Sequence, residues 1–185
     1  MNPAPNLVLV GPMGSGKSSI GRRLAERFGL AFLDADREIE AQAGASIATI
    51  FECAGEADFR AREQAVLATL LAGEGAVIAT GGGAVVDPRT RRLLRERGFV
   101  VHLHIDVPRQ LERLARDRTR PLLAADDREQ VLRRLAETRD PLYAEVADLR
   151  FDTAAANAND TVARLGRLLD LHWQMAAAPA GSAIP

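Results

Sequence analysis

The sequence predicts an α/β protein of three layers, in which a five-stranded parallel sheet lies between two layers of helices. Short runs rich in Val, Ile, Leu and Phe alternate with longer stretches of helical periodicity, an order typical of such sheets. The runs are almost continuously apolar, as strands buried on both faces are. The 185 residues contain no internal repeat or linker. We therefore expect a single domain over residues 1–175.

The expected elements follow one another in a regular order. Strands are predicted at residues 7–10, 31–33, 76–79, 99–105 and 149–152. Helices are predicted at residues 19–28, 37–43, 46–53, 57–71, 88–97, 108–116, 128–146 and 160–174. Gly29 is placed to cap the first helix, and Pro108 stands at an early helical position. We expect residues 117–127 to form a loop and residues 176–185 to be a disordered tail.

The first strand runs directly into a phosphate-binding motif. Residues 11–18 read Gly-Pro-Met-Gly-Ser-Gly-Lys-Ser and match G-x-x-x-x-G-K-[ST] at every fixed position. A strand before the motif and a helix after it create an anion site from backbone N–H groups and the helix dipole. Lys17 is the only lysine among 24 basic residues, and its compact ammonium suits a narrow phosphate site. We expect Lys17 to contact the β- and γ-phosphates and Ser18 to bind Mg²⁺.

The residues after the second and third strands point to a second substrate, because ligands of such sheets bind beyond the carboxyl ends of the strands. Asp34 and Asp36 follow the second strand and would share one side of an extended chain. They suit a magnesium-shell ligand and a hydroxyl-binding residue or base, although either could instead cap the next helix. Residues 81–83, three glycines after the third strand, indicate close approach by a ligand or else a flexible turn.

Composition excludes several classes of function. The formal net charge of −1 provides no electrostatic attraction for nucleic acid or an anionic membrane, and no apolar run has the length of a membrane span. Cys53 is alone, so no internal disulfide forms and we expect a cytoplasmic protein. His102 and His104 share one face of a strand; ordinary strand residues are favoured there over a metal site.

Across about residues 6–170, the chain resembles the shikimate kinase family in six motifs that occur in the family order. They are the phosphate-binding loop, Asp34 with Asp36, Phe59-Arg60, Gly-Gly-Gly-Ala-Val at 81–85, Arg-Pro-Leu-Leu at 120–123 and Arg-Asp-Pro-Leu-Tyr at 139–143. The resemblance implies a P-loop kinase architecture like that of nucleoside-monophosphate kinases. Within it, a helical substrate-binding insert would cover about residues 36–71 and a lid about residues 117–127.

The implied activity is phosphorylation of the 3-hydroxyl of shikimate by ATP, in the chorismate pathway to aromatic amino acids. Mg²⁺ is the implied cofactor, the partners are ATP and shikimate, and we expect a monomer. Nucleotide binding is implied for Gly14, Ser15, Gly16, Lys17, Ser18, Ser19, Arg113 and Arg120. Shikimate binding is implied for Asp36, Arg60, Gly82 and Arg139, with the two arginines on the substrate carboxylate, which suits guanidinium forks.

The remaining roles implied by the resemblance concern catalysis and the metal. Lys17, Asp36 and Arg120 are the implied catalytic residues: Asp36 as the candidate base, and Arg120 as a lid residue that closes over the phosphates. Ser18 would bind Mg²⁺ directly and Asp34 through water, while Arg113 would contact the adenine.

One departure and two alternatives accompany this interpretation. Family members often carry a proline and a basic residue in the adenine loop, where this chain has Thr-Ala-Ala-Ala-Asn-Ala-Asn-Asp at 153–160.

A gluconate- or nucleoside-monophosphate-type kinase would keep the phosphate-binding loop but need other groups at Asp36, Arg60 and 81–83. A non-catalytic nucleotide-binding protein would lack a coherent acceptor site. The predicted acceptor residues and the basic lid argue against both.

Overall fold

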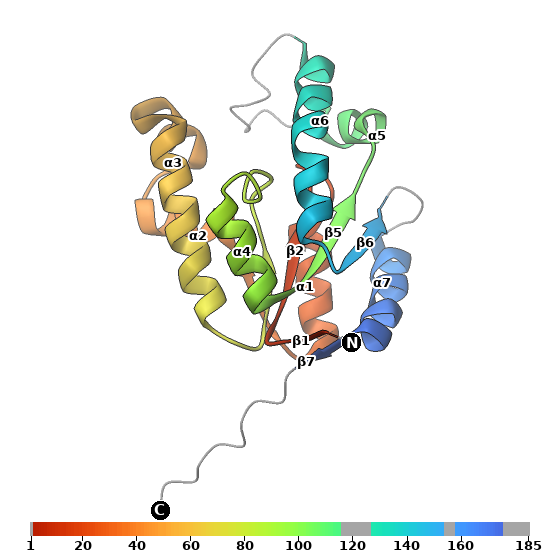
Figure 1. The fold of residues 1–185 in the computed structure, drawn as a ribbon. Coiled ribbons are helices and arrows are strands. Elements are labelled where there is room, and N and C mark those ends of the chain that lie inside the picture. Colours follow the sequence, from red (N-terminus) through yellow and green to blue (C-terminus); the bar gives the residue numbers. More distant parts are fainter. Residues whose placement is uncertain (1, 116–126, 154–157, 176–185) are drawn as a thin grey trace, which may run out of the picture.

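A computed structural model describes residues 2–115, 127–153 and 158–175 of the chain. Within these ranges the main sheet has five parallel strands, as predicted, and their order is β3-β4-β2-β5-β6 (Figure 1). Its strands are β2 (Asn6–Val10), β3 (Ala31–Asp34), β4 (Ala76–Ala79), β5 (Gly98–His104) and β6 (Leu149–Asp152). The helices are α1 (Lys17–Phe28), α2 (Ala35–Ala43), α3 (Ile47–Ala72), α4 (Pro88–Arg97), α5 (Val107–Leu114), α6 (Arg128–Val146) and α7 (Ala158–His172).

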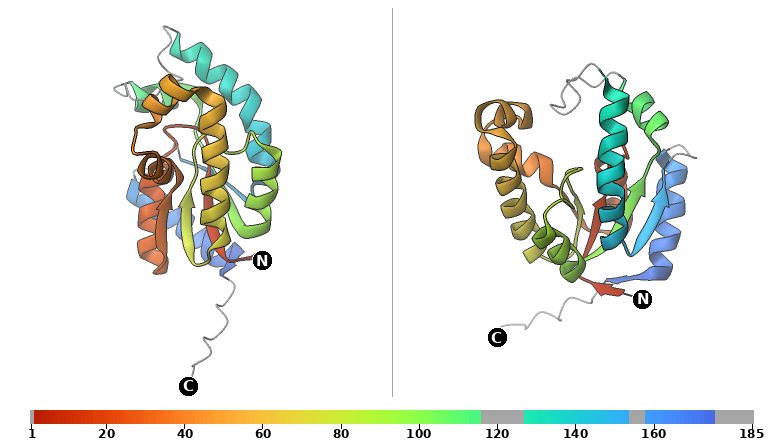
Figure 2. Two further views of the ribbon diagram at one scale, coloured as in Figure 1. Left: turned by 90° about the vertical axis from the view of Figure 1, so that its left-hand side faces the viewer. Right: turned by 45° about the horizontal axis from the view of Figure 1, so that its top comes forward.

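Alternate residues of each central strand enter two separate cores, because successive side chains of a strand point to opposite faces. Leu7 and Leu9 of β2 pack with residues of α1 and α7. Val8 and Val10 pack with residues of α2, α3, α4 and α6 on the other face. The three-layer arrangement is therefore confirmed, and Figures 1 and 2 show the helices on both sides of the sheet.

The helical region after β3 contains a break that the sequence places correctly. Gly55 has φ 80° and ψ 174° within α3, so the chain bends there into two helical halves. These halves correspond to the two stretches predicted at 46–53 and 57–71. The backbone of an L-residue with a side chain rarely adopts this φ, which explains why glycine stands at the bend.

The end of the last helix differs from the prediction. We expected helix to residue 174, but α7 ends at His172 and β7 (Trp173–Met175) pairs in parallel with β1 (Asn2–Ala4). Trp173 is buried against Phe28 and Phe99, and its indole Nε1 donates to the carbonyl of Ala4 at 3.1 Å. The residues before β7 form an amphipathic helix, and nothing in their local pattern signals this long-range strand pairing.

Most of the predicted lid, residues 117–127, and the predicted tail, residues 176–185, lie outside the described residues. Asp127 is described and caps α6 through its side chain. His102 and His104 lie on β5, where His102 stacks against Tyr143 of α6. Among the described helices, none is both long and apolar enough to cross a membrane.

Candidate active site

Three neighbouring strands bring the predicted site residues to one edge of the sheet. β4 lies between β3 and β2, so the turn after β4 lies between the residues that follow the other two strands. Asp34 pairs with Ala79 in register, and Ala79 pairs with Leu9 on the other side. The carboxyl ends of parallel strands share an edge, so the acidic residues, the glycines and the phosphate-binding loop converge there.

The phosphate-binding loop takes its shape from glycines in backbone conformations that other residues avoid. Gly11, Gly14 and Gly16 all have positive φ, of 144°, 77° and 93°. A Cβ on Gly11 would also collide with the carbonyl oxygen of Leu103 in β5. The loop can therefore fold tightly against the sheet only with glycine at these positions.

The start of α1 leaves its backbone donors available to an anion. Gly16 precedes the helix without a side-chain cap, and its first turn contains no acidic residue. By contrast, side chains cap each of the described helices α2 to α6; they are Asp34, Ser46, Asp87, Asp106 and Asp127. Uncapped N–H groups at a helix start bind phosphate well, because the helix dipole adds partial positive charge.

Two further contacts hold the loop in place. The Lys17 ammonium donates to the carbonyls of Gly11 and Pro12, at 2.8 and 2.9 Å, so it lies over the loop. Gln110, which is buried in α5, donates to the carbonyl of Met13 at 2.8 Å. The Ser15 hydroxyl is buried without a partner in the described part of the chain. Sequence reasoning missed Gln110, whose polar side chain occupies a buried position on a short amphipathic helix.

Asp34 and Asp36 lie at the expected edge of the sheet, but the prediction that they share one side of an extended chain is wrong. Helix α2 begins at Ala35, so Asp36 occupies a first helical turn and does not share an extended segment with Asp34. Asp34 is the helix cap: its Oδ1 accepts from the backbone N–H groups of Asp36 and Arg37, at 3.2 and 3.4 Å. A short acidic side chain before a helix satisfies donors that have no partner within the helix.

The four predicted acceptor residues Asp36, Arg60, Gly82 and Arg139 line one cavity of about 540 Å³. They come from α2, α3, the turn after β4 and α6, which are separated by as many as 103 residues. Met13 of the phosphate-binding loop lines the same cavity, so the acceptor pocket adjoins the nucleotide side. Apolar residues of both halves of α3, such as Phe51 and Phe59, complete its wall.

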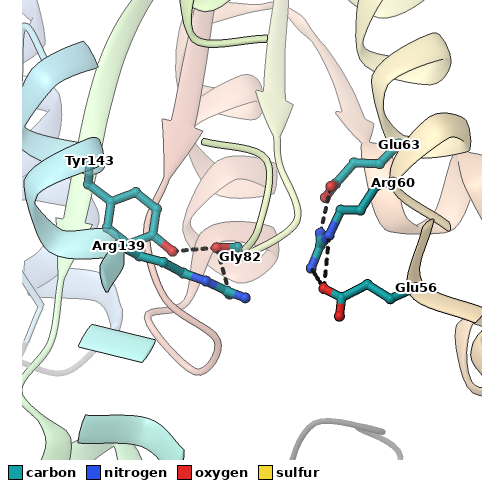
Figure 3. A network of polar contacts seen from close by, with 6 residues as sticks. All are labelled: Glu56, Arg60, Glu63, Gly82, Arg139 and Tyr143. Carbon is teal, nitrogen blue, oxygen red and sulfur yellow. Dashed lines mark hydrogen bonds and ion pairs between the residues drawn. The ribbon is translucent and has the colours of Figure 1, made fainter. Parts of the chain in front are cut away.

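Arg60 is held in this cavity by carboxylates of its own helix (Figure 3). Its Nη1 donates to Glu63 at 2.6 Å and its Nη2 to Glu56 at 3.1 Å. Burial lowers the pKa of Arg60, but the two carboxylates outweigh this and raise it overall, so the guanidinium stays charged. Burial raises the pKa of Glu63, and Asp36 adds to that rise while Arg60 opposes it.

Glu63 is a candidate functional residue that sequence reasoning missed. Its side chain is 5% exposed, and its Oε1 has no hydrogen-bond partner among the described residues. A signal was present, because Phe59, Glu63 and Val66 share one buried face of α3. A carboxylate on a buried apolar face of a helix is costly unless it is paired, and Arg60 lies one helical turn before Glu63.

Two of the three glycines after β4, Gly81 and Gly83, are required by neighbouring side chains of the protein. None of them has a positive φ. A Cβ on Gly81 would collide with Glu63 and with Asp36, and one on Gly83 would collide with the Arg60 guanidinium. The expected close approach therefore exists, but it comes from α2 and α3 and is present without any ligand. The carbonyl of Gly82 accepts from Arg139 at 3.1 Å and from Tyr143 at 2.5 Å (Figure 3).

The remaining predicted residues lie on the nucleotide side or outside the described ranges. Arg113 of α5 donates to the carbonyl of Gly14 at 3.1 Å and to that of Thr153, after β6, at 2.7 Å. It thus bridges the phosphate-binding loop and the predicted adenine loop. Ser18 and Ser19 are exposed at the start of α1. Arg120 lies outside the described residues.

Comparison with known proteins shows the family of this chain. The family model for shikimate kinase matches residues 13–170. The shikimate kinase of Stenotrophomonas maltophilia (strain K279a) is 59% identical over 174 residues, which cover 94% of this chain and 97% of the relative. That of Xanthomonas euvesicatoria pv. vesicatoria (strain 85-10) is 57% identical over 180 residues, covering 97% of this chain and 100% of the relative.

A solved structure extends the similarity to three dimensions. Shikimate kinase from Acinetobacter baumannii, in complex with shikimate, superposes with a TM-score of 0.88 at 47% identity, covering 91% of this chain and 94% of that one. The fold, the family and the kinase class predicted from the sequence are therefore confirmed. Because the family model matches most of the chain and the relatives are 57–59% identical over nearly its full length, this chain belongs to the shikimate kinase family.

Proposed function

We propose that this protein transfers the γ-phosphoryl group of ATP to the 3-hydroxyl of shikimate, releasing ADP. One observation carries the proposal: Asp36, Arg60, Gly82 and Arg139 line a single cavity that also includes Met13 of the phosphate-binding loop. An acceptor in this cavity would present its hydroxyl towards the γ-phosphate, and such positioning supplies much of the rate enhancement in phosphoryl transfer.

The acceptor side binds a polyhydroxylated carboxylic acid. The guanidinium groups of Arg60 and Arg139 hold the carboxylate, since planar forks form paired hydrogen bonds with it. Asp36 accepts from the hydroxyl groups and is the candidate base for the attacking oxygen. Phe51 and Phe59 supply apolar surface for the ring. A nucleoside monophosphate, with its phosphate and bulky base, would suit this acid-containing cavity poorly.

The nucleotide side stabilises the charge on the phosphates. Backbone N–H groups of residues 14–19 bind phosphate oxygens, and the Lys17 ammonium moves from its own loop carbonyls to the β- and γ-phosphates. Arg113, which bridges Gly14 and Thr153, would contact the adenine. The role of Arg120 over the phosphates remains a prediction from its motif.

The residues present fit a magnesium ion. Ser18 is exposed at the start of α1, and Asp34 uses only Oδ1 for its capping bonds, so Oδ2 can face a metal-bound water. In the described ranges, no group of three or more His, Cys, Asp or Glu side chains could hold a metal. Mg²⁺ at such sites commonly takes one or two protein ligands together with phosphates and water. Bound there, it would offset the charge that develops on the phosphates.

A coupled ADP-release assay with and without shikimate tests this function. We expect ADP release that requires both shikimate and Mg²⁺, with little release when gluconate or a nucleoside monophosphate replaces shikimate. Equal rates with those acceptors would exclude the assignment, and sedimentation of the active protein would test the expected monomer.

A further inference from the structure

Tyr143 has no part in the proposed reaction, yet it contacts the acceptor site directly. Its side chain is 1% exposed on α6, and its hydroxyl donates to the carbonyl of Gly82 at 2.5 Å. The carbonyl oxygen of Gly82 also accepts a hydrogen bond from Nη1 of Arg139, at 3.1 Å. Arg139 lies one helical turn before Tyr143 on α6. Two donors from one helix therefore hold a single carbonyl of the glycine turn, as Figure 3 shows.

This anchoring determines which side of the turn faces the substrate pocket. The peptide bonds are trans, so the N–H of Gly83 points away from the carbonyl of Gly82. Tyr143 and Arg139 lie on one side of the turn, and Arg60 lies on the other (Figure 3). Holding the carbonyl towards α6 thus directs the following N–H away from α6, and Gly83 lines the substrate cavity. The backbone of Gly83 lies directly against Arg60, so the turn supports both arginines.

We propose that Tyr143 is a positioning residue for shikimate: it fixes the glycine turn through the carbonyl of Gly82 and so places Arg60, Arg139 and the amide of Gly83 around the substrate carboxylate. This inference rests on the proposed function. Arg139 alone cannot do the same, because its guanidinium must also meet the substrate. When it turns to the carboxylate, the Tyr143 hydroxyl continues to satisfy the buried carbonyl.

The surroundings of Tyr143 suit this role. Its ring stacks on His102 of β5, with centroids 4.9 Å apart and planes inclined by 31°, which restricts the direction of the hydroxyl. Burial raises the pKa of the Tyr143 phenol, so it remains a hydrogen-bond donor. Further along the turn, Nη1 of Arg91 donates to the carbonyls of Val85 and Val86, and Arg91 is paired with Glu145 of α6. Helix α6 therefore supports the turn at two points.

The first test replaces Tyr143 by Phe, which keeps the ring and removes only the hydroxyl. We expect the Kd and KM for shikimate to rise about five- to tenfold, as the loss of one hydrogen bond of this kind implies. We expect kcat to change less than threefold, and the Kd of a non-hydrolysable ATP analogue less than twofold. Trp173→Phe is the control, because it removes a buried donor from the carbonyl of Ala4 far from the turn. It should lower Tm without changing shikimate binding.

A second measurement needs no variant. Tyr143 is the only tyrosine in the chain, so incorporated ¹³C-tyrosine gives signals from this ring alone. Saturation with shikimate should shift these signals. Wild-type shikimate affinity in Tyr143→Phe, or tyrosine signals that do not respond to shikimate, would overturn the role of Tyr143 while leaving the proposed function intact. A wild-type protein that does not bind shikimate at all would overturn both.

Discussion

The nucleotide side and the acceptor side of this site are built in different ways. The proposed nucleotide side is a continuous segment, residues 11–19, and the groups that would bind phosphate there are mostly backbone N–H groups at the uncapped start of α1. The acceptor side consists of side chains from α2, α3 and α6 around a glycine turn; Arg60 is held by carboxylates of its own helix, and Arg139 by the carbonyl of Gly82. The first depends on local backbone geometry, and the second on tertiary packing.

This difference implies that the two sides should fail separately. A change in the phosphate-binding loop should reduce catalysis with any acceptor, because the γ-phosphate is then misplaced. A change in the pairs that hold Arg60 or the glycine turn should weaken shikimate binding while nucleotide binding stays intact. Substitutions at Lys17, at Arg60 or Arg139 and at Gly83 test this separation, while a prediction for His102 concerns the stability of the fold that supports both sides. They are given from the largest expected effect to the smallest.

Lys17→Arg should cause the largest loss, at least about 100-fold in kcat, or about 3 kcal/mol of transition-state stabilisation. Lys17 is buried over its own loop, where the broad guanidinium fork has no equivalent position. Steady-state kinetics at saturating shikimate measures the effect. A kcat within about threefold of wild type would show that this position accepts any cation.

His102 should make the fold sensitive to acid. Burial, with smaller contributions from His104, Arg150 and Lys17, lowers the pKa of His102 to about 4. The unfolded chain, with a pKa near 6.5, binds the proton first, so stability is complete above about pH 6.5 and falls as the pH drops towards 4. The difference between the folded and unfolded pKa values corresponds to about 3 kcal/mol in the free energy of unfolding. Urea unfolding at pH 7 and pH 4.5 would detect this loss of stability.

His102→Phe should remove most of this acid sensitivity, because Phe can stack against Tyr143 without titrating. His172→Gln is the matched control: His172 is exposed at the end of α7, so the control should lose stability in acid as the wild type does. Identical acid dependence of the wild type and His102→Phe would contradict the explanation.

Arg60→Lys keeps the charge but loses the fork, so shikimate should bind more weakly by about 1–3 kcal/mol. Arg139→Lys should behave in the same way. Separate titrations with shikimate and with a non-hydrolysable ATP analogue should show a loss only for shikimate. Arg167→Lys, at an exposed position of α7, should be silent in both titrations. Wild-type shikimate affinity in Arg60→Lys would exclude the acceptor-site model at that position.

Gly83→Ala should produce a smaller, selective loss, with shikimate affinity reduced about tenfold, or about 1.4 kcal/mol. The added Cβ would displace the Arg60 guanidinium, which is the end of a flexible side chain, so the fold itself should persist. Calorimetric titration with shikimate measures the change, and thermal unfolding checks the fold. Gly73→Ala is the control, since its Cβ would meet only ordinary contacts. A similar loss of shikimate affinity in both variants would contradict a specific role of the glycine turn in holding Arg60.

The sequence by itself determined the features that depend on neighbouring residues. The phosphate-binding loop, the buried strands and the two halves of α3 all follow from local patterns of glycine and apolar residues. The order of motifs also led to the family and to Asp36, Arg60, Gly82 and Arg139, which the structure brings into one cavity. Such features are local because backbone geometry and strand burial are specified over a few residues.

Only the tertiary structure decided how those residues are held. It assigned the capping role to Asp34, showed that Glu63, Asp36 and Arg60 require glycine at positions 81 and 83, and paired β1 with β7. It also placed Gln110 beneath the phosphate-binding loop and Tyr143 on the glycine turn. Apart from the local cap by Asp34, these contacts join positions 18 to 171 residues apart. The energy of these longer-range contacts comes from burial and hydrogen bonds that exist only when distant segments pack together, so local patterns do not specify them.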